Sequence, residues 1–200
     1  MNLKIALLMG VSCLLAGIAA AQVPYPQYIK KYQQDYVKNH EVVNKADKKH
    51  FRFFAPLSNY KVAASFKALK DTVGFMMPTS GKEPKRYFRY GYIDFSLDGK
   101  KLKLTVFRSK DLMTDPTYKD YLFLPFTDLT SGEESYGGGR YIDLEIKHIK
   151  NNKLIIDFNK AYNPYCAYSD EYNCPIPPRE NDMAVAIKAG EKNFEKVGGK

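Results

Sequence analysis

Hydrophobic and polar residues alternate with a period of two along two neighbouring segments in the middle of the chain. Apolar residues occupy every second position from Ile93 to Leu97 and again from Leu102 to Val106. Between them stands Asp98-Gly99, a dipeptide that favours the tight turns of β-hairpins. The pattern therefore predicts two antiparallel strands joined by a two-residue turn.

A second antiparallel pair is predicted from residues 141–149 and 153–158, around Asn151-Asn152. Asparagine tolerates the left-handed backbone conformation that such a turn requires. Shorter β-rich runs lie at residues 60–66, 73–77, 86–90, 121–126 and 184–187. Hairpins without intervening helices argue against a doubly wound parallel sheet. We therefore expect a mainly β, α+β single domain whose antiparallel sheet forms a barrel or a sandwich.

A different period marks the polar residues 26–50. The residues that follow a helical spacing of three, four, four and three are Ile29, Tyr32, Tyr36, His40 and Val43. They share one helical face, which we expect to pack on the β-rich part, because a helix of this composition gains little from propensity alone. His40 is interpreted as a packing residue rather than a metal ligand, since no second ligand follows it at helical spacing.

The first 21 residues have the layout of an export signal. Lys4 precedes an apolar run, and Ala19-Ala20-Ala21 offers a small-residue cleavage site before Gln22. An uncleaved anchor is the first alternative, but the apolar run of 17 residues is at the short limit for crossing a bilayer. Lipid attachment at Cys13 is the second. We expect cleavage, a periplasmic or secreted protein, and no stable membrane insertion afterwards.

Removing residues 1–21 from the 200 leaves 179, which suits one domain. We divide the chain into this signal peptide, an N-terminal helical segment at 22–52, a β-rich domain at 53–191 and a frayed tail at 192–200. The formal net charge is +9, but the lysines are dispersed along the chain. A nucleic-acid partner is therefore not expected, because such binding needs basic residues clustered with aromatic ones.

Cys166 and Cys174 are the only cysteines after the leader. An even pair in an exported protein favours a disulfide, which in the chain-entropy description would contribute about 2.6 kcal/mol. A metal site is a weaker alternative because no histidine stands nearby, and a redox pair more often has the spacing CxxC. No metal and no cofactor are expected.

Turn residues, carboxylates and amides concentrate between Tyr121 and Ile187. The run Gly137-Gly138-Gly139 permits close approach of a ligand or of another backbone segment. Arg140 follows directly and can form a planar fork against a carboxylate or phosphate. It can also pair with Asp128 or Glu134 and hold its own loop closed, and for Arg140 itself we favour this internal pairing.

Side-chain amides follow the next predicted strand. Asn159 stands at the strand end, and Pro164 forces an extended or turn conformation on Asn163. We predict a small polar or anionic ligand at a loop end. The predicted ligand-binding residues are Asp128, Arg140, Asn159 and Asn163. Tyrosines around the cysteine loop can either stack on such a ligand or fill gaps over the disulfide.

The alternative function is a hydrolase that acts on cell-envelope carbohydrate or lipid through paired carboxylates. Its candidate carboxylates are Asp128, Glu134, Asp157 and Glu180. Two of them would need to lie about 5 to 10 Å apart in one cleft, as glycoside chemistry requires. The serine-hydrolase elbow and the HExxH zinc motif are both absent, so no residue receives a catalytic role.

Two blocks of the chain, FTDLTSGEESYGGGRYIDL and DFNKAYNPYCAYSDEYNCPIPPREND with the following AVAIKAGEK, carry a resemblance to a known family. The chain resembles the bacterial and archaeal family called domain of unknown function 1684, with weaker similarity back to about Phe53. Ser135 stands where we expect threonine. The positions that match the family pattern are Asp128, Gly132, Tyr136, Gly139, Arg140, Asp157, Asn159, Asn163, Cys166, Cys174, Pro175 and Glu180. The resemblance implies no mechanism, since the family has no assigned activity.

Overall fold

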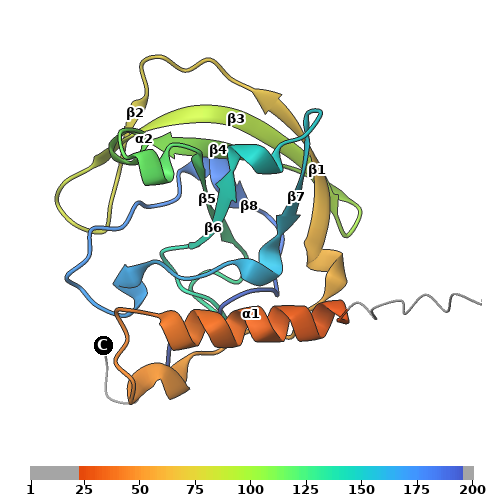
Figure 1. Ribbon diagram of the computed structural model, residues 1–200, viewed down its shortest axis with the longest axis vertical. Helices are drawn as coiled ribbons and strands as arrows, with labels where there is room; N and C mark the ends of the chain where they lie inside the picture. The colour runs from red at the N-terminus through yellow and green to blue at the C-terminus, as the bar shows by residue number, and fades with distance from the viewer. Residues whose placement is uncertain (1–22, 196–200) are drawn as a thin grey trace, which may run out of the picture.

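The computed structural model describes residues 23–195, in which strands dominate and one long helix lies beside them (Figure 1). The two α-helices are α1 (Tyr25–Asn39) and α2 (Lys110–Met113). The strands are β1 (Lys61–Ala68), β2 (Phe75–Met77), β3 (Lys85–Leu97), β4 (Lys100–Ser109), β5 (Tyr121–Asp128), β6 (Arg140–Glu145), β7 (Lys153–Asp157) and β8 (Asp182–Met183). The predicted signal peptide and Cys13 lie outside the described residues. Within 23–195, no helix has the length and apolar character needed to span a bilayer.

The main sheet is antiparallel and curls into a half-barrel. Its strand order is β6-β5-β4-β3-β1-β7, with β2 added to β3 and β8 paired in parallel with β5. This arrangement confirms the predicted fold class, a mainly β, barrel-like α+β single domain. The strands β6 and β7 end the order on its two sides, so each of them has one edge without a strand partner.

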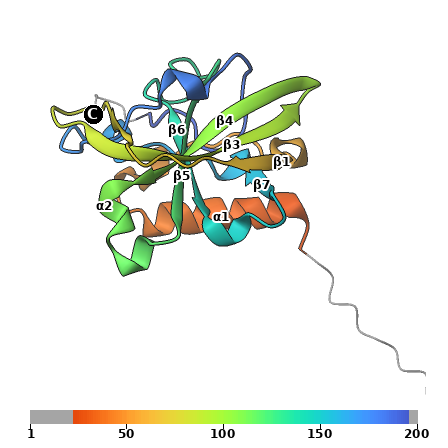
Figure 2. The same cartoon turned by 90° about the horizontal axis from the view of Figure 1, so that it is seen from above.

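The predicted hairpin at the centre of the chain is confirmed. Ile93 lies opposite Leu104, and Phe95 lies opposite Leu102. The turn residues Asp98 and Gly99 both have positive φ, 48° and 76°, as the tightest hairpin turns require. Figure 2 shows the tip of this hairpin pointing away from α1.

The second predicted hairpin forms only at its turn, where Lys150 and Lys153 exchange two backbone hydrogen bonds (2.8 and 2.9 Å), and its two predicted strands do not pair with each other. Asn151 and Asn152 have the left-handed conformation, with φ values of 51° and 57°. However, β6 pairs with β5, and β7 pairs with β1. A 3-10 turn at Ile146–His148 separates them, and the backbone N–H of Glu145 donates to Nδ1 of His148 over 3.0 Å. This local bond turns the chain away from the line of β6 before it can pair with β7.

The C-terminal part of the chain fills the inside of the half-barrel. Val185, Ile187 and Ala189 are buried in the main hydrophobic cluster. Residues 184–187, predicted as a strand, form no ladder: residues 184 and 185 lie in a bend, and the strand β8 ends at Met183. This segment contributes apolar side chains to the core while its backbone bonds to loops.

A buried side chain completes the sheet between β4 and β5. Pro125 in β5 has no N–H to donate, and the two strands share a single register pair. Asn181 lies in this gap: its Oδ1 accepts from the N–H of Thr105 (2.7 Å), and its Nδ2 donates to the carbonyls of Thr105 (2.8 Å) and Pro125 (2.6 Å). An amide side chain thus replaces the missing strand bonds.

The helix α1 lies across the open side of the half-barrel (Figure 1). It buries Ile29 and Gln33, and Tyr25 Oη donates to Asp157 Oδ1 over 2.7 Å. The helix ends at Asn39, well before the predicted end at residue 50. His40 is already extended, and its Nδ1 accepts from a backbone N–H three residues later, which stops the helical hydrogen bonding.

Residues just after the β-rich part contact the segment that follows the helix. Lys192 N–H donates to the carbonyl of Arg52 (2.9 Å), and the ring of Phe194 packs edge-on against Phe51 and Tyr168. Lys192 and Phe194 are therefore attached to the folded part of the chain. The last five residues, 196–200, lie outside the described part of the chain.

Glu191 is a fully buried carboxylate next to these residues. Its oxygens accept from Tyr168 Oη (2.6 Å), Asn163 N–H (2.9 Å) and Tyr36 Oη (3.4 Å). Burial raises the pKa of Glu191 from its ordinary value of 4.5 to about 7, against the opposing effect of these hydrogen bonds. Because Tyr36 belongs to α1, the carboxylate joins the helix to the C-terminal segment.

The raised pKa predicts a pH dependence of stability. Between about pH 4.5 and 7 the folded protein keeps the Glu191 proton while the unfolded chain releases it. This contribution to the free energy of unfolding is complete at low pH and is lost as the pH rises through about 7. Denaturation at pH 5 and pH 8 should show a loss on the order of 2 kcal/mol that Glu191→Gln abolishes. Parallel pH profiles for the two proteins would contradict this assignment.

Candidate functional site

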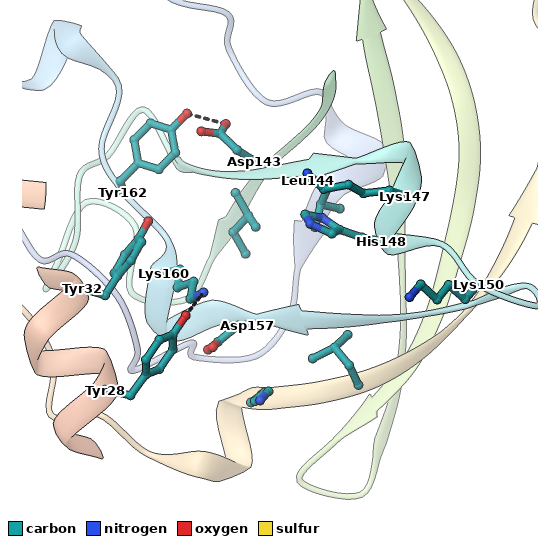
Figure 3. A pocket seen from close by; sticks show the side chains of 13 residues that line it. Tyr28, Tyr32, Asp143, Leu144, Lys147, His148, Lys150, Asp157, Lys160 and Tyr162 are labelled. Atoms are coloured by element: carbon teal, nitrogen blue, oxygen red, sulfur yellow. Dashed lines mark hydrogen bonds between the residues drawn. The ribbon is translucent and has the colours of Figure 1, made fainter. Parts of the chain in front are cut away.

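The unpaired edges of β6 and β7 face each other across a cleft with a volume of about 680 Å³ (Figure 3). Ile142, Asp143 and Leu144 line it from β6, and Ile155 and Asp157 line it from β7. The cleft is thus located where the half-barrel fails to close. The same feature, that β6 and β7 do not pair with each other, explains both the incorrect hairpin prediction and the cleft.

Tyrosines form the wall of the cleft opposite the strands. Tyr28 and Tyr32 project into it from α1, and Tyr162 lies at its end (Figure 3). Burial raises the pKa of Tyr32 to about 12, and it raises the pKa of Tyr162 well above its ordinary value. Both hydroxyls therefore stay protonated at physiological pH and can donate hydrogen bonds.

Basic side chains surround the rest of the opening. They are Lys61, Lys147, Lys150, Lys160 and His148. Lys147 pairs with Glu145 over 2.6 Å, whereas the other three lysines make no ion pair within residues 23–195. Lys160 Nζ donates to Tyr28 Oη (2.8 Å) and lies 5.1 Å from the ring centre of Tyr32, which holds its ammonium group beside the wall.

Asp143 lies at the inner end of the cleft. Its Oδ1 accepts from both Tyr121 Oη and Tyr162 Oη, each over 2.7 Å. The carboxylate is open to the cleft but enclosed by protein on its other sides, and this desolvation raises its pKa, while the two tyrosine bonds lower it. Oδ2 has no hydrogen-bond partner among the described residues.

Backbone groups also point into the opening. Tyr141 and Glu145 both direct their N–H groups away from β5, to Tyr162 (2.9 Å) and His148 (3.0 Å). Because orientation alternates along a strand, the N–H and C=O of Asp143, midway between them, face the same edge. They have no partner within the described chain, so a ligand can bond to them.

A second cavity of about 860 Å³ adjoins the first. The two share Tyr32, Asp143 and Tyr162 as lining residues. Seven of the residues around the second cavity are tyrosines, and it extends to the cysteine loop at Cys174 and Pro175. Together the cavities form one elongated cleft with Asp143 at the junction.

The arginine and the aspartate that the sequence predicted to bind a ligand lie outside this cleft. Arg140 and Asp128 are buried and form an ion pair, with Nη2 2.8 Å from Oδ2. Arg140 also donates to the carbonyls of Ile187 (2.8 Å), Ala189 (2.5 Å) and Glu191 (3.1 Å). Asp128 Oδ1 accepts from the N–H of Ile187 (3.0 Å). The pair fastens the C-terminal segment inside the half-barrel.

The two predicted asparagines are also buried. Asn159 exchanges hydrogen bonds with the backbone of Leu57 and donates to Asp157 Oδ1 (3.1 Å). Asn163 Nδ2 donates to the carbonyl of Lys192 (2.8 Å), while its Oδ1 has no partner within residues 23–195. The two asparagines do not line the elongated cleft, and neither do Arg140 and Asp128. Ligand contact by these four residues stays a prediction.

The candidate carboxylates for hydrolysis are dispersed over the molecule. Glu134 pairs with Lys188 at the surface (2.8 Å), and Glu180 pairs with Arg89 (3.0 Å). Of the four proposed from the sequence, Asp157 is the one that lines the cleft. Its companion there is Asp143, which sequence reasoning did not select.

The predicted disulfide is confirmed, with the Cα atoms of Cys166 and Cys174 6.2 Å apart. Some tyrosines near the disulfide pack inside the protein, and others line a cavity where a ligand could stack on them. Tyr168 packs against His40 with ring centres 4.6 Å apart, whereas Tyr165 and Tyr172 line the second cavity. The bridged loop therefore forms part of the cleft wall.

The remaining site residues had little signal in the sequence. Asp143 occupies one position in an alternating strand, and the lysines around the cleft come from the start of β1 and from both sides of β7. The charge pattern of residues 147–160, on both sides of the asparagine turn, is the signal that could have identified them. This pattern indicates a site only because β6 and β7 remain apart.

Comparisons with known proteins agree with the fold. The family model described as "Protein of unknown function (DUF1684)" matches residues 47–192. The chain is similar to a solution NMR structure of an uncharacterized protein from Haloarcula marismortui, with 28% identity and a TM-score of 0.60. The similarity covers 83% of this chain and 94% of that one. No curated protein matches the chain.

Replacing Arg140 with methionine should destabilise the protein by about 3 to 5 kcal/mol, because the substitution leaves the buried Asp128 carboxylate unpaired. Arg89→Met is the control. Its partner Glu180 is partly exposed, and its loss should cost about 1 kcal/mol or less. Urea denaturation of both variants measures the difference. Similar losses in the two proteins would show that the buried pair is not a principal support of the fold.

Proposed function

We propose, from the premise that this chain belongs to the DUF1684 family of proteins of unknown function, that it binds a small anionic ligand in the cleft between β6 and β7. One observation carries the proposal: four lysines and a histidine surround a cleft that contains two carboxylates. Lys61, Lys150 and Lys160 have no carboxylate partner within residues 23–195, so their charges are available to a ligand.

The chemistry of the walls supports a ligand that is both charged and rich in hydrogen-bonding groups. Lysines attract a phosphate or carboxylate as point charges and set the approach of the ligand. The protonated hydroxyl of Tyr32 and the backbone N–H of Asp143 add directional donors. Apolar side chains of Ile142 and Ile155 complete the surface, as is common in small-molecule sites.

In this proposal the four residues predicted from the sequence support the cleft. Asn159 holds Asp157 at the end of β7, and Asn163 stands directly after Tyr162. Arg140 and Asp128 fix the segment behind them. We further propose that binding takes place outside the cytoplasm, which the disulfide supports, because such bonds persist in oxidising compartments.

Removing the unpaired charges should weaken anion binding. Lys61→Gln and Lys150→Gln should each lower the affinity for inorganic phosphate or citrate by roughly five- to tenfold, as loss of one favourable charge contact requires. Isothermal titration calorimetry at low salt measures this. Lys103→Gln is the matched control, because Lys103 lies on β4 beside Asp94, outside the cleft.

The control should bind these anions as tightly as the unaltered protein. Equal binding by all the variants would place the anion site elsewhere. The absence of measurable binding of either anion by the unaltered protein would remove the proposal.

Hydrolysis of a carbohydrate or lipid is the second candidate function. It is favoured by the presence of Asp143 and Asp157 in the same cavity. The pKa of Asp143 is raised by burial, as suits a general acid, and its Oδ2 has no hydrogen-bond partner within residues 23–195. Asp157 would then act as the second carboxylate of the pair.

This candidate predicts that Asp143→Asn abolishes turnover. Release of 4-nitrophenol from a panel of 4-nitrophenyl glycosides, phosphates and acyl esters should fall at least about a hundredfold relative to the unaltered protein. Asp94→Asn, on the distant hairpin, should retain activity. A wild-type protein that cleaves none of these substrates would leave binding as the function.

A further inference from the structure

We infer that the ligand is a saccharide bearing an anionic group, with its charged end among the lysines and its sugar ring among the tyrosines of the second cavity. This inference rests on the proposed function and specifies its ligand class. The cleft is continuous. Both cavities are lined by Tyr32, Asp143 and Tyr162, so one molecule can extend from one cavity into the other.

The two ends of the cleft differ in charge. The first cavity has four lysines and two carboxylates around it. The second has a single lysine, Lys85, together with Asp35, Glu41 and the shared Asp143. An anion is therefore attracted to the first cavity and disfavoured in the second. A ligand that fills both must be anionic at one end and neutral at the other.

The neutral end faces aromatic rings that are tilted against one another. Tyr141 and Tyr162 meet at 88°, and Tyr165 and Tyr172 meet at 65°. A planar base is best held between parallel rings, and these pairs provide none. A curved wall of tilted rings suits the puckered, CH-bearing face of a sugar, while carboxylates such as Glu41 accept from its hydroxyls.

Donors without partners line the same cavity. Within residues 23–195, the hydroxyls of Tyr165 and Tyr172 make no hydrogen bond, and neither does Nε2 of His40. His40 is 7% exposed, and its Nδ1 accepts from the N–H of Val43 (3.1 Å), so Nε2 carries the proton. This nitrogen is enclosed by protein, so the donors open to a sugar are the hydroxyls of the two exposed tyrosines.

The test compares whole and partial ligands by calorimetry. The probes are glucuronic acid, galacturonic acid, glucose 6-phosphate and N-acetylglucosamine 6-phosphate, with inorganic phosphate and glucose as the two separate parts. At least one anionic sugar should bind about tenfold more tightly than either part alone. The uronic acids and the sugar phosphates distinguish a carboxylate from a phosphate as the anionic group.

Two variants assign the ends of the ligand. Tyr172→Leu should lower the affinity for that anionic sugar roughly tenfold and leave inorganic phosphate binding unchanged, because the ring lies only in the second cavity. Lys150→Gln should weaken both. Tyr92→Leu is the control, since Tyr92 lies on β3 against Lys103 and lines neither cavity.

Failure of this inference differs from failure of the proposed function. If inorganic phosphate binds through Lys150 but all four anionic sugars bind no more tightly than phosphate, the anion site stands and the saccharide is wrong. A preference for adenosine 5′-monophosphate over every sugar would also overturn the saccharide and indicate a base-stacking ligand. If no probe binds, both are wrong.

Discussion

The buried ion pair between Arg140 and Asp128 is the interaction on which the rest of the molecule depends. Arg140 bonds to three carbonyls of the C-terminal segment, and this segment supplies the apolar side chains that fill the half-barrel. The same segment ends in Glu191, which is bonded to Tyr36 of α1. The pair is thus linked to the helix through a chain of direct contacts. Since α1 provides a wall of the cleft, this structural salt bridge supports the candidate site from behind.

Local patterns were sufficient to predict the parts of the fold that depend on neighbouring residues. The alternation around Asp98-Gly99 specifies a hairpin because the turn and both strands lie within a few residues of each other. The cysteine pair specifies a disulfide for the same reason. The pairing of β6 and β7 with other strands was not predictable in this way. Their asparagine turn has the expected conformation, yet the partners β5 and β1 are chosen by distant packing.

The candidate site was predicted less well than the fold, and the reason is physical. The sequence drew attention to unusual residues such as Arg140, Asn159 and Asn163, which are the buried polar groups that a β scaffold with many loops needs to satisfy its backbone. The groups around the cleft are ordinary lysines and tyrosines. Their significance arises from long-range geometry, because they gather where two sheet edges remain apart. Polar residues in turns thus indicate how loops are held together as often as they indicate binding.

The disulfide has a consequence for when the cleft is complete. Cys166 and Cys174 enclose the loop that carries Tyr172 to the rim of the second cavity, and Tyr172 meets Tyr165 there. Before the two thiols are oxidised, this loop lacks its covalent tether, and the aromatic rim is not fixed. Maturation of the cavity is then coupled to thiol oxidation, so under the proposed function the reduced chain would hold a ligand less well than the oxidised one.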